Sequence, residues 1–276
     1  MNSNIEDAYP GLIIFLLCIG LFIAGYLVYK FFTGSAIFLF NQYILNRYHL
    51  NYQERSILES KNSFYRNLNP ALKKKFECNV KYFMQDKVFE GREDFIVKKE
   101  TELMIAAAAT QISFGHFPTI FEHFHKIIIH PDKYYSSYTD QYHHGEVHSS
   151  GIIKLSWKAF TEGLRIKDDG FHVGFHEMAH ALKIEDYTLH DTEHCFLDKK
   201  SLQEFHGYAQ ERIKNNPESK ILRDYAFSNA EEFFAVSIEH FFELPNELNK
   251  MEPDVFNYLK KLLKLDPLNK PNPVLK

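Results

Sequence analysis

The sequence predicts an α+β domain, mostly helical with a small sheet, behind one N-terminal transmembrane helix. The transmembrane helix is predicted because Pro10 to Tyr29 contains no charged residue and is mostly apolar, and about 20 such residues span a bilayer core. The helical domain is predicted because apolar residues recur at helical spacing in several downstream segments. Two β-rich runs among them, 124–130 and 145–157, predict the small sheet.

The composition excludes some classes of protein. The chain has 276 residues, 45% of them hydrophobic, so it can bury a substantial core. The net charge of −4 shows no basic excess, and nucleic acid is therefore not an expected partner. The three cysteines are widely separated, which is not the pattern of a disulfide framework and fits a reducing compartment.

The N-terminal region is expected to anchor the protein in a membrane. Its expected parts are a short non-cytoplasmic N-terminus at 1–9, the transmembrane helix at 10–30 and a membrane-proximal linker at 31–52. A cleaved signal peptide and a buried core helix are the rival interpretations, but the acidic start and the long apolar run disfavour a signal peptide. Because Lys30 and Arg47 follow the apolar run, the positive-inside rule predicts a single-pass protein of the cytoplasmic membrane whose C-terminal domain faces the cytoplasm.

The linker contains two features of its own. Thr33-Gly34-Ser35 is expected to interrupt the helical run. Residues 36–45 are apolar but too short to span a bilayer. They either lie at the membrane surface or form the first helix of the soluble domain, and their composition does not separate these alternatives.

Residues 53–266 are expected to form the soluble domain, and 267–276 a loosely ordered tail. Asn69-Pro70 divides residues 53–90 into two helices, because proline after asparagine is a helix-start signal. The alanine-rich run within 100–114 predicts a helix that another element approaches closely. The other expected elements are a strand at 124–130, a hairpin at 145–157, a polar connection at 158–170, and helices around 171–182, 230–242 and 253–265.

One motif proposes both a metal and a reaction. His176-Glu177-Met178-Ala179-His180 has the pattern H-E-x-x-H, which on a helix places two imidazoles on one face, where both can bind one Zn²⁺. Glu177 would lie beside a metal-bound water and could take its proton. The alternative without a metal site is a surface helix with two solvated histidines. The apolar residues on either side of the motif favour a buried helix instead, in which these polar groups need partners.

A catalytic zinc site needs a third protein ligand. Because Ser228 and Glu231 have the spacing of a capping box, Glu231 is expected to fold back onto the helix start, which leaves Glu232 as the third ligand and Glu231 as the less favoured choice. Glu239, two turns along the same stripe, either accepts a hydrogen bond from a ligand histidine or lies at the surface. Tyr225 precedes this helix, where its phenol could donate a hydrogen bond to an oxyanion.

Two further features bear on binding. Six histidines lie in or near the predicted strands, at positions 123, 125, 130, 143, 144 and 148. A second metal site there is conceivable, but scattered histidines are more often polar surface or loop residues. The hairpin at 145–157 is either an ordinary internal hairpin or a strand edge on which an extended peptide could align across the metal.

Taken together, these residues resemble the Mlc titration factor A family of zinc-dependent peptidases and, more distantly, the catalytic domain of anthrax lethal factor. The landmarks occur in order at residues 64–72, 89–91, 105–109, 145–157, 176–180 and 230–242. The resemblance implies a zincin-like fold of the gluzincin type, Glu232 as the third zinc ligand and Tyr225 as a residue that assists catalysis. The family's namesake also sequesters a transcriptional repressor. This sequence departs from the family in its N-terminal apolar segment and in the stretch after His180.

The sequence therefore predicts a membrane-anchored zinc metallopeptidase with one Zn²⁺ per chain and a peptide or protein substrate. His176, His180 and Glu232 hold the metal, and Glu177 is the general base. The alternative is a metal-stabilised binding protein that sequesters a regulatory partner such as a transcription factor. The base and a set of three ligands favour the enzyme, because structural zinc usually has four protein ligands.

Overall fold

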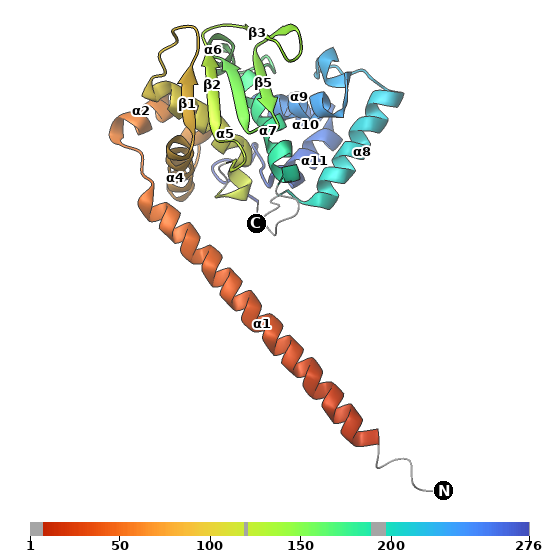
Figure 1. Cartoon of the computed structure of the whole chain (residues 1–276). Helices are drawn as coiled ribbons and strands as arrows, with labels where there is room; N and C mark the ends of the chain where they lie inside the picture. Colours follow the sequence, from red (N-terminus) through yellow and green to blue (C-terminus); the bar gives the residue numbers. More distant parts are fainter. Residues whose placement is uncertain (1–7, 119–120, 189–196, 276) are drawn as a thin grey trace. The chain divides into compact units, whose positions relative to one another are not determined.

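The computed structural model describes residues 8–118, 121–188 and 197–275 (Figure 1). The chain divides into two compact units, Met1–Arg47 and Tyr48–Lys276. The division falls where a single long helix ends, five residues before the predicted end of the linker.

The first unit consists of helix α1, Ala8–Arg47. This helix continues through Thr33-Gly34-Ser35, so the predicted interruption there is wrong. A single glycine inside a helix costs only about 1 kcal/mol relative to alanine, and no proline follows Pro10 within this segment. Among the described residues, no helix has both the length and the apolar character needed to cross a membrane. The predicted transmembrane helix at 10–30 is therefore not supported by the structure.

The second unit is mostly helical with a small sheet, as the sequence predicts. Its helices before the sheet are α2 (Tyr52–Lys61), α3 (Ser63–Arg66), α4 (Pro70–Asp86) and α5 (Lys99–Ser113), followed by the short 3₁₀ helix η1 (Phe114–His116). The later helices are α6 (Trp157–Arg165), α7 (Val173–Thr188), α8 (Lys199–Asn215), η2 (Asp224–Phe227), α9 (Ala230–Glu243), α10 (Pro245–Met251) and α11 (Pro253–Leu263).

The sheet has the strand order β1-β2-β6-β5. Its strands are β1 (Val88–Gly91), β2 (Lys126–His130), β6 (Ile152–Ser156) and β5 (Gly145–His148), and a separate hairpin joins β3 (Tyr134–Ser136) to β4 (Gln141–His143). Strands β1, β2 and β6 are parallel, whereas β5 is antiparallel to β6. The predicted strand before Pro131 and the predicted hairpin are both confirmed, and β5 is an edge strand.

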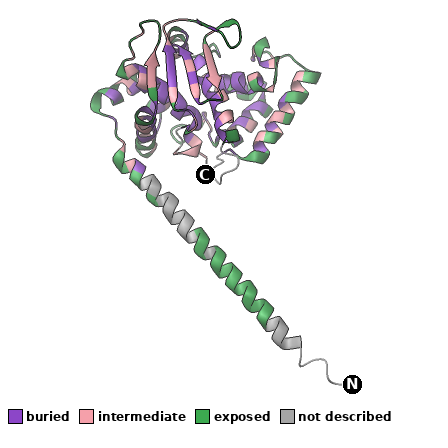
Figure 2. Ribbon diagram, viewed as in Figure 1, coloured by how far each residue is buried: buried purple, intermediate pink, exposed green. Residues whose placement is uncertain are grey.

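Helix α5 lies at the centre of the core. Residues Ala106–Ala109 are buried, and the helix contacts both α4 and α7, which confirms the close approach expected from its alanines. Helix α7 in turn contacts α9 and strands β5 and β6. Figure 2 shows the buried residues concentrated in the middle of the sheet and in the helices packed against it. The helix that carries the H-E-x-x-H motif is thus held between the sheet edge and α9.

Several expectations for the loops and ends need correction. The polar connection expected at 158–170 is largely helix α6, because the Ser156 side chain caps Ala159 N at 3.2 Å and Phe160 is buried. The first predicted helix is divided into α2 and α3, whereas the start of α4 after Asn69 is confirmed by its cap. The tail is not loosely ordered: Leu275 N donates to Lys264 O at 2.9 Å.

Candidate metal centre

The metal helix begins at a defined turn. Asp169 Oδ1 accepts a hydrogen bond from Phe171 N at 3.0 Å. Gly170 has a φ of +69°, and a Cβ there would lie 2.4 Å from His240 Nε2, so only glycine fits. His172 then caps the helix, because its Nδ1 accepts from Phe175 N at 3.2 Å. This turn fixes the direction in which α7 leaves the loop.

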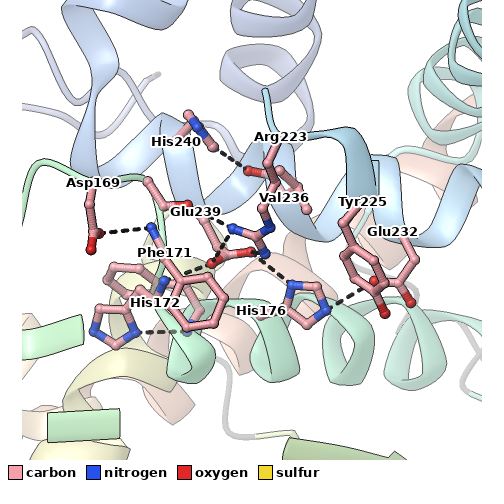
Figure 3. Close-up of polar contacts among 12 residues, drawn as sticks. Asp169, Phe171, His172, His176, Arg223, Tyr225, Glu232, Val236, Glu239 and His240 are labelled. Atoms are coloured by element: carbon pink, nitrogen blue, oxygen red, sulfur yellow. Dashed lines mark hydrogen bonds and ion pairs between the residues drawn. The ribbon is translucent and has the colours of Figure 1, made fainter. Parts of the chain in front are cut away.

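The structure brings His176, His180 and Glu232 together. Their candidate ligand atoms all lie within 4.8 Å of one another. His176 Nε2 is 3.0 Å from Glu232 Oε2 (Figure 3). His180 Nε2 is 3.6 Å from Glu232 Oε1, and the two Nε2 atoms are 3.2 Å apart. All three side chains are half-buried rather than sealed. Two imidazoles and a carboxylate form the donor set typical of catalytic zinc, with a position left for water.

Glu232 is placed by a helix cap that differs from the predicted one. The helix is capped by Asn229, whose side chain accepts hydrogen bonds from the backbone N–H groups of Glu231 and Glu232. Ser228 has helical backbone angles and donates its hydroxyl to Tyr225 O at 2.8 Å, so the predicted capping box with Glu231 is wrong. Glu231 instead pairs with Lys183 on α7, and it does not face the histidines.

Glu239 is fully buried, which decides between its two predicted positions. Its Oε1 accepts a hydrogen bond from His176 Nδ1 at 2.8 Å, which leaves Nε2 of that ring directed at Glu232. Arg223 Nη2 donates to the same oxygen at 2.6 Å, and His172 N donates to Oε2 at 2.6 Å (Figure 3). A carboxylate on the far nitrogen orients a ligand histidine and strengthens it as a donor to a metal. No spacing in the sequence indicated Arg223.

Charge is distributed in the way that a cation site requires. Burial lowers the pKa of His176, but the carboxylates of Glu232 and Glu239 outweigh it and raise that pKa to about 10. Burial also acts against ionisation of Glu232, yet hydrogen bonds from His176 and His180 hold its pKa well below the usual range. In the metal-free protein these shifts favour an ionised Glu232 carboxylate beside a protonated His176 ring. A divalent cation would replace that proton.

Glu177 lies between the metal cluster and the sheet edge. Its side chain is buried, and burial raises the pKa of its carboxyl. Strand β5 packs directly on it, because a Cβ added to Gly145 would lie 2.4 Å from Glu177 Oε1. A carboxyl whose pKa is raised above its usual range is suited to take up and release a proton.

Tyr225 lies on η2, before α9. Its ring centroid is 6.1 Å from that of His176, and its side chain is beside Glu232 (Figure 3). Partial burial and the negative charge of Glu232 raise the pKa of the phenol to about 12. At neutral pH the phenol keeps its proton and can donate it in a hydrogen bond.

The six histidines near the strands form no comparable group. Within the described ranges, the cluster of His176, His180 and Glu232 is the one set of three potential metal ligands. Of the six, His123 Nε2 lies 2.7 Å from Ser149 O and His130 Nδ1 lies 3.2 Å from Glu93 Oε1. His123 and His130 thus have local polar partners, and the described residues contain no second cluster of potential metal ligands at the strands.

The α+β domain and the His₂-Glu cluster define a protein with a candidate metal centre. The chain belongs to the family of glucose-regulated metallopeptidases M90, which is the Mlc titration factor A family, and the family model matches residues 39–264. The resemblance found in the sequence is thus confirmed. The chain is also similar to an uncharacterised protein of Synechocystis sp., with 27% identity over 231 residues that cover 78% of this chain and 84% of the relative.

Proposed function

We propose that the protein is a zinc-dependent peptidase that hydrolyses peptide bonds with Glu177 as general base. The observation that carries the proposal is a buried carboxyl one residue from a His₂-Glu cluster and in contact with an edge strand. Membership of a metallopeptidase family supports it. A purely structural metal would not need a carboxyl in this place.

Four residues hold and orient the metal in this proposal. His176, His180 and Glu232 supply the ligand atoms, and Glu239 fixes the ring of His176 through Nδ1. Bound Zn²⁺ would lower the pKa of a water molecule and polarise the carbonyl group that the water attacks. The fit rests on the donor set, which matches the His₂Glu ligands of catalytic zinc.

Glu177 and Tyr225 move and hold protons. Glu177 takes a proton from the attacking water as the new C–O bond forms. It then delivers that proton to the amine nitrogen as the C–N bond breaks, so that the carboxylate is regenerated. The Tyr225 phenol donates a hydrogen bond to the carbonyl oxygen, on which negative charge develops.

Strand β5 aligns the substrate. Its one partner within the described sheet is β6, so the other edge is open for an extended peptide. Pairing along an edge supplies main-chain hydrogen bonds that do not depend on side-chain identity. Because Gly145 contacts Glu177, a peptide on this edge would pass beside the general base.

The cellular location is a separate proposal that rests on the sequence alone. The uncharged run from Pro10 to Tyr29, followed by Lys30 and Arg47, supports attachment to the cytoplasmic membrane with the peptidase domain in the cytoplasm. Membrane fractionation of cells tests this. Recovery of the full chain in the supernatant without detergent would contradict it.

The peptidase proposal is tested with the full chain, as wild type and as Glu177→Gln. We expect about one zinc per chain in both proteins by elemental analysis. We expect cleavage of a mixed peptide library, followed by mass spectrometry, only in the wild type. Zinc in both with cleavage in neither would favour the alternative, a metal-stabilised protein that sequesters a regulatory partner. The absence of bound metal from both would contradict the site itself.

A further inference from the structure

A cavity opens directly beside the metal cluster. It has a volume of about 950 Å³, and two of the candidate metal ligands, His180 and Glu232, line it. The rest of its wall comes from the end of β5, from α7 and α8, and from the start of α9. Because the ligands themselves form part of the wall, a peptide held at the metal would extend into this cavity.

Strand β5 leads from the general base to the cavity. Gly145 contacts Glu177, and Val147, which lines the cavity, is two residues further along the strand. Residues two apart lie on one face of a strand, about 7 Å from each other. A peptide paired with the open edge of β5 would place alternate side chains on this same face. One of its side chains, close to the bond beside Glu177, would therefore enter the cavity.

Much of the cavity wall is apolar. Val147, Ile184 and Ala230 are partly buried residues that pack against the core and supply aliphatic surface. Tyr187 adds an exposed aromatic ring. The free energy gained by a side chain on such a wall grows with the apolar area that it removes from water. The cavity should therefore prefer a large side chain to a small one.

The charged part of the wall is neutral as a whole. Lys183 and Glu231 both line the cavity and form an ion pair with each other. The Lys183 side chain is only 16% exposed, and its Nζ also lies 5.7 Å from the centre of the Phe234 ring. Apart from the histidines and Glu232, the described lining residues include no other Asp, Glu, Lys or Arg. A charged side chain that entered would lose its water without gaining a partner.

We propose that this cavity is a side-chain subsite for the bound peptide, that it selects a large uncharged side chain next to the cleaved bond, and that the Lys183–Glu231 pair determines the selection against charge. The inference rests on the proposed peptidase function, because it takes the peptide to lie along β5 and beside the metal. Neither residue of the pair touches the reacting atoms, so the pair acts on binding. Breaking the pair from either side leaves one charge unpaired, and the preference should move to the opposite charge.

The test measures binding rather than cleavage, so its outcome is separate from that of the peptidase proposal. The full chain carrying Glu177→Gln is titrated, in the presence of Zn²⁺, into fluorescein-labelled peptides of glycine and serine that differ only in one central residue. That residue is phenylalanine, leucine, glycine, glutamate or lysine, and fluorescence anisotropy gives each Kd. We expect the phenylalanine and leucine peptides to bind about tenfold more tightly than the glycine peptide. The glutamate and lysine peptides should bind no more tightly than the glycine peptide.

Two opposite variants test the ion pair. Glu231→Gln leaves Lys183 without its acidic partner, so the glutamate peptide should gain about fivefold in affinity and the lysine peptide should gain nothing. Lys183→Gln should produce the reverse. Glu100→Gln is the matched control for Glu231→Gln, because it breaks the Lys61–Glu100 pair away from the cavity and makes the same change in net charge. It should leave the order of affinities unchanged.

Tyr187→Ala tests the apolar wall at a residue that is 79% exposed. The phenylalanine peptide should bind about threefold more weakly to this variant. Tyr52→Ala is its control, because Tyr52 is 85% exposed and lies on α2. Equal affinity for the phenylalanine and glycine peptides, no measurable binding of either, or the same charge preference in Glu231→Gln and Lys183→Gln would each overturn the proposal. The expected order of affinities without cleavage in the wild type would support the subsite and count against the peptidase.

Discussion

Two histidines four residues apart, His172 at the N-cap of α7 and His176 in its first turn, are in opposite electrostatic environments. His172 and His176 are both largely buried, yet the pKa of His172 falls to about 4 whereas that of His176 rises to about 10. Glu239 contacts both residues, but it accepts a backbone N–H from His172 and a ring N–H from His176. Only His176 also faces Glu232. Burial by itself keeps an imidazole neutral, and buried carboxylates at the ring reverse that effect.

The difference separates the N-cap of α7 from its first turn. His172 at the N-cap has a neutral ring with no carboxylate at its ring nitrogens. His176 in the first turn faces two carboxylates of α9 and suits a cation. The following predictions test this division, from the largest expected effect to the smallest.

Removing the Glu232 carboxylate, which faces His176 in the first turn of α7, should have the largest effect. Glu232→Gln deletes a charged ligand atom, so zinc affinity should fall by more than the roughly 10–100-fold typical of an outer-shell residue. Competition with a chelator of known affinity measures the change. Glu231→Gln is the matched control, because Glu231 is the neighbouring carboxylate and pairs with Lys183. A larger loss in the control would transfer the ligand role to Glu231.

Tyr225→Phe removes the phenol that lies beside the cluster and leaves the ring. We expect kcat to fall by about 100-fold, the lower range for loss of one oxyanion donor, because the side chain is partly exposed. KM and zinc content should be unchanged. An unchanged kcat in peptide hydrolysis would exclude the phenol from the reaction, and a loss of zinc would show that it supports the metal instead.

Glu239→Gln makes the surroundings of His176 more like those of His172, because it removes a carboxylate from the ring. The ring of His176 loses the charge on its Nδ1 partner, and Arg223 loses its ion pair, so zinc affinity should fall by about 10–100-fold. Chelator competition again gives the affinity, and circular dichroism checks that the variant is folded. Wild-type zinc affinity in a folded variant would show that the buried carboxylate does not tune the metal site.

Glu243, the last residue of α9, should make the stability of the protein depend on pH. Its pKa is raised from 4.5 to about 8 in the folded protein, so the folded state binds this proton more tightly than the unfolded state does. The stabilisation is present below pH 4.5 and is lost as the pH rises through about 8. Allowing for partial exposure, the loss is on the order of 2 kcal/mol.

Urea unfolding at pH 5 and pH 8 measures this effect. The free energy of unfolding of the wild type should fall between these pH values by more than that of Glu243→Gln, which cannot titrate. Parallel pH dependence in the two proteins would show that this carboxyl is not protonated in the folded state. Because the comparison is a difference between variants, other titrating groups such as Glu185 cancel.

Local sequence signals predicted the elements that local interactions define. Asn69-Pro70 begins α4 because its cap and its proline act within one turn. The alanine run marks α5 because small side chains allow α4 and α7 to approach. Helix α8 was missed although its signal was present: Asp198 caps it, and Phe205 and Ala209 are buried on one face.

Other features depend on contacts that the sequence does not display. Two capping residues compete before α9, and Asn229 prevails because Ser228 is already part of the η2 turn. Glu239 is buried only because Arg223 and the start of α7 surround it. The tail is ordered because its backbone pairs with residues near the end of α11. For Glu239 and the tail, the residues that fix the structure are remote in sequence. For the start of α9, two neighbouring residues compete for the same capping role.

The sequence by itself determined the class of fold and indicated the three residues of the candidate metal centre, because H-E-x-x-H at helical spacing and a carboxylate on a buried stripe favour a shared cation. Only the tertiary structure decided the pKa values of these groups. The packing of α9 against α7 places two carboxylates around His176 and leaves the ring nitrogens of His172 without one. Spacing along a helix fixes which side chains share a face, but the pKa of a side chain depends on what packs against that face.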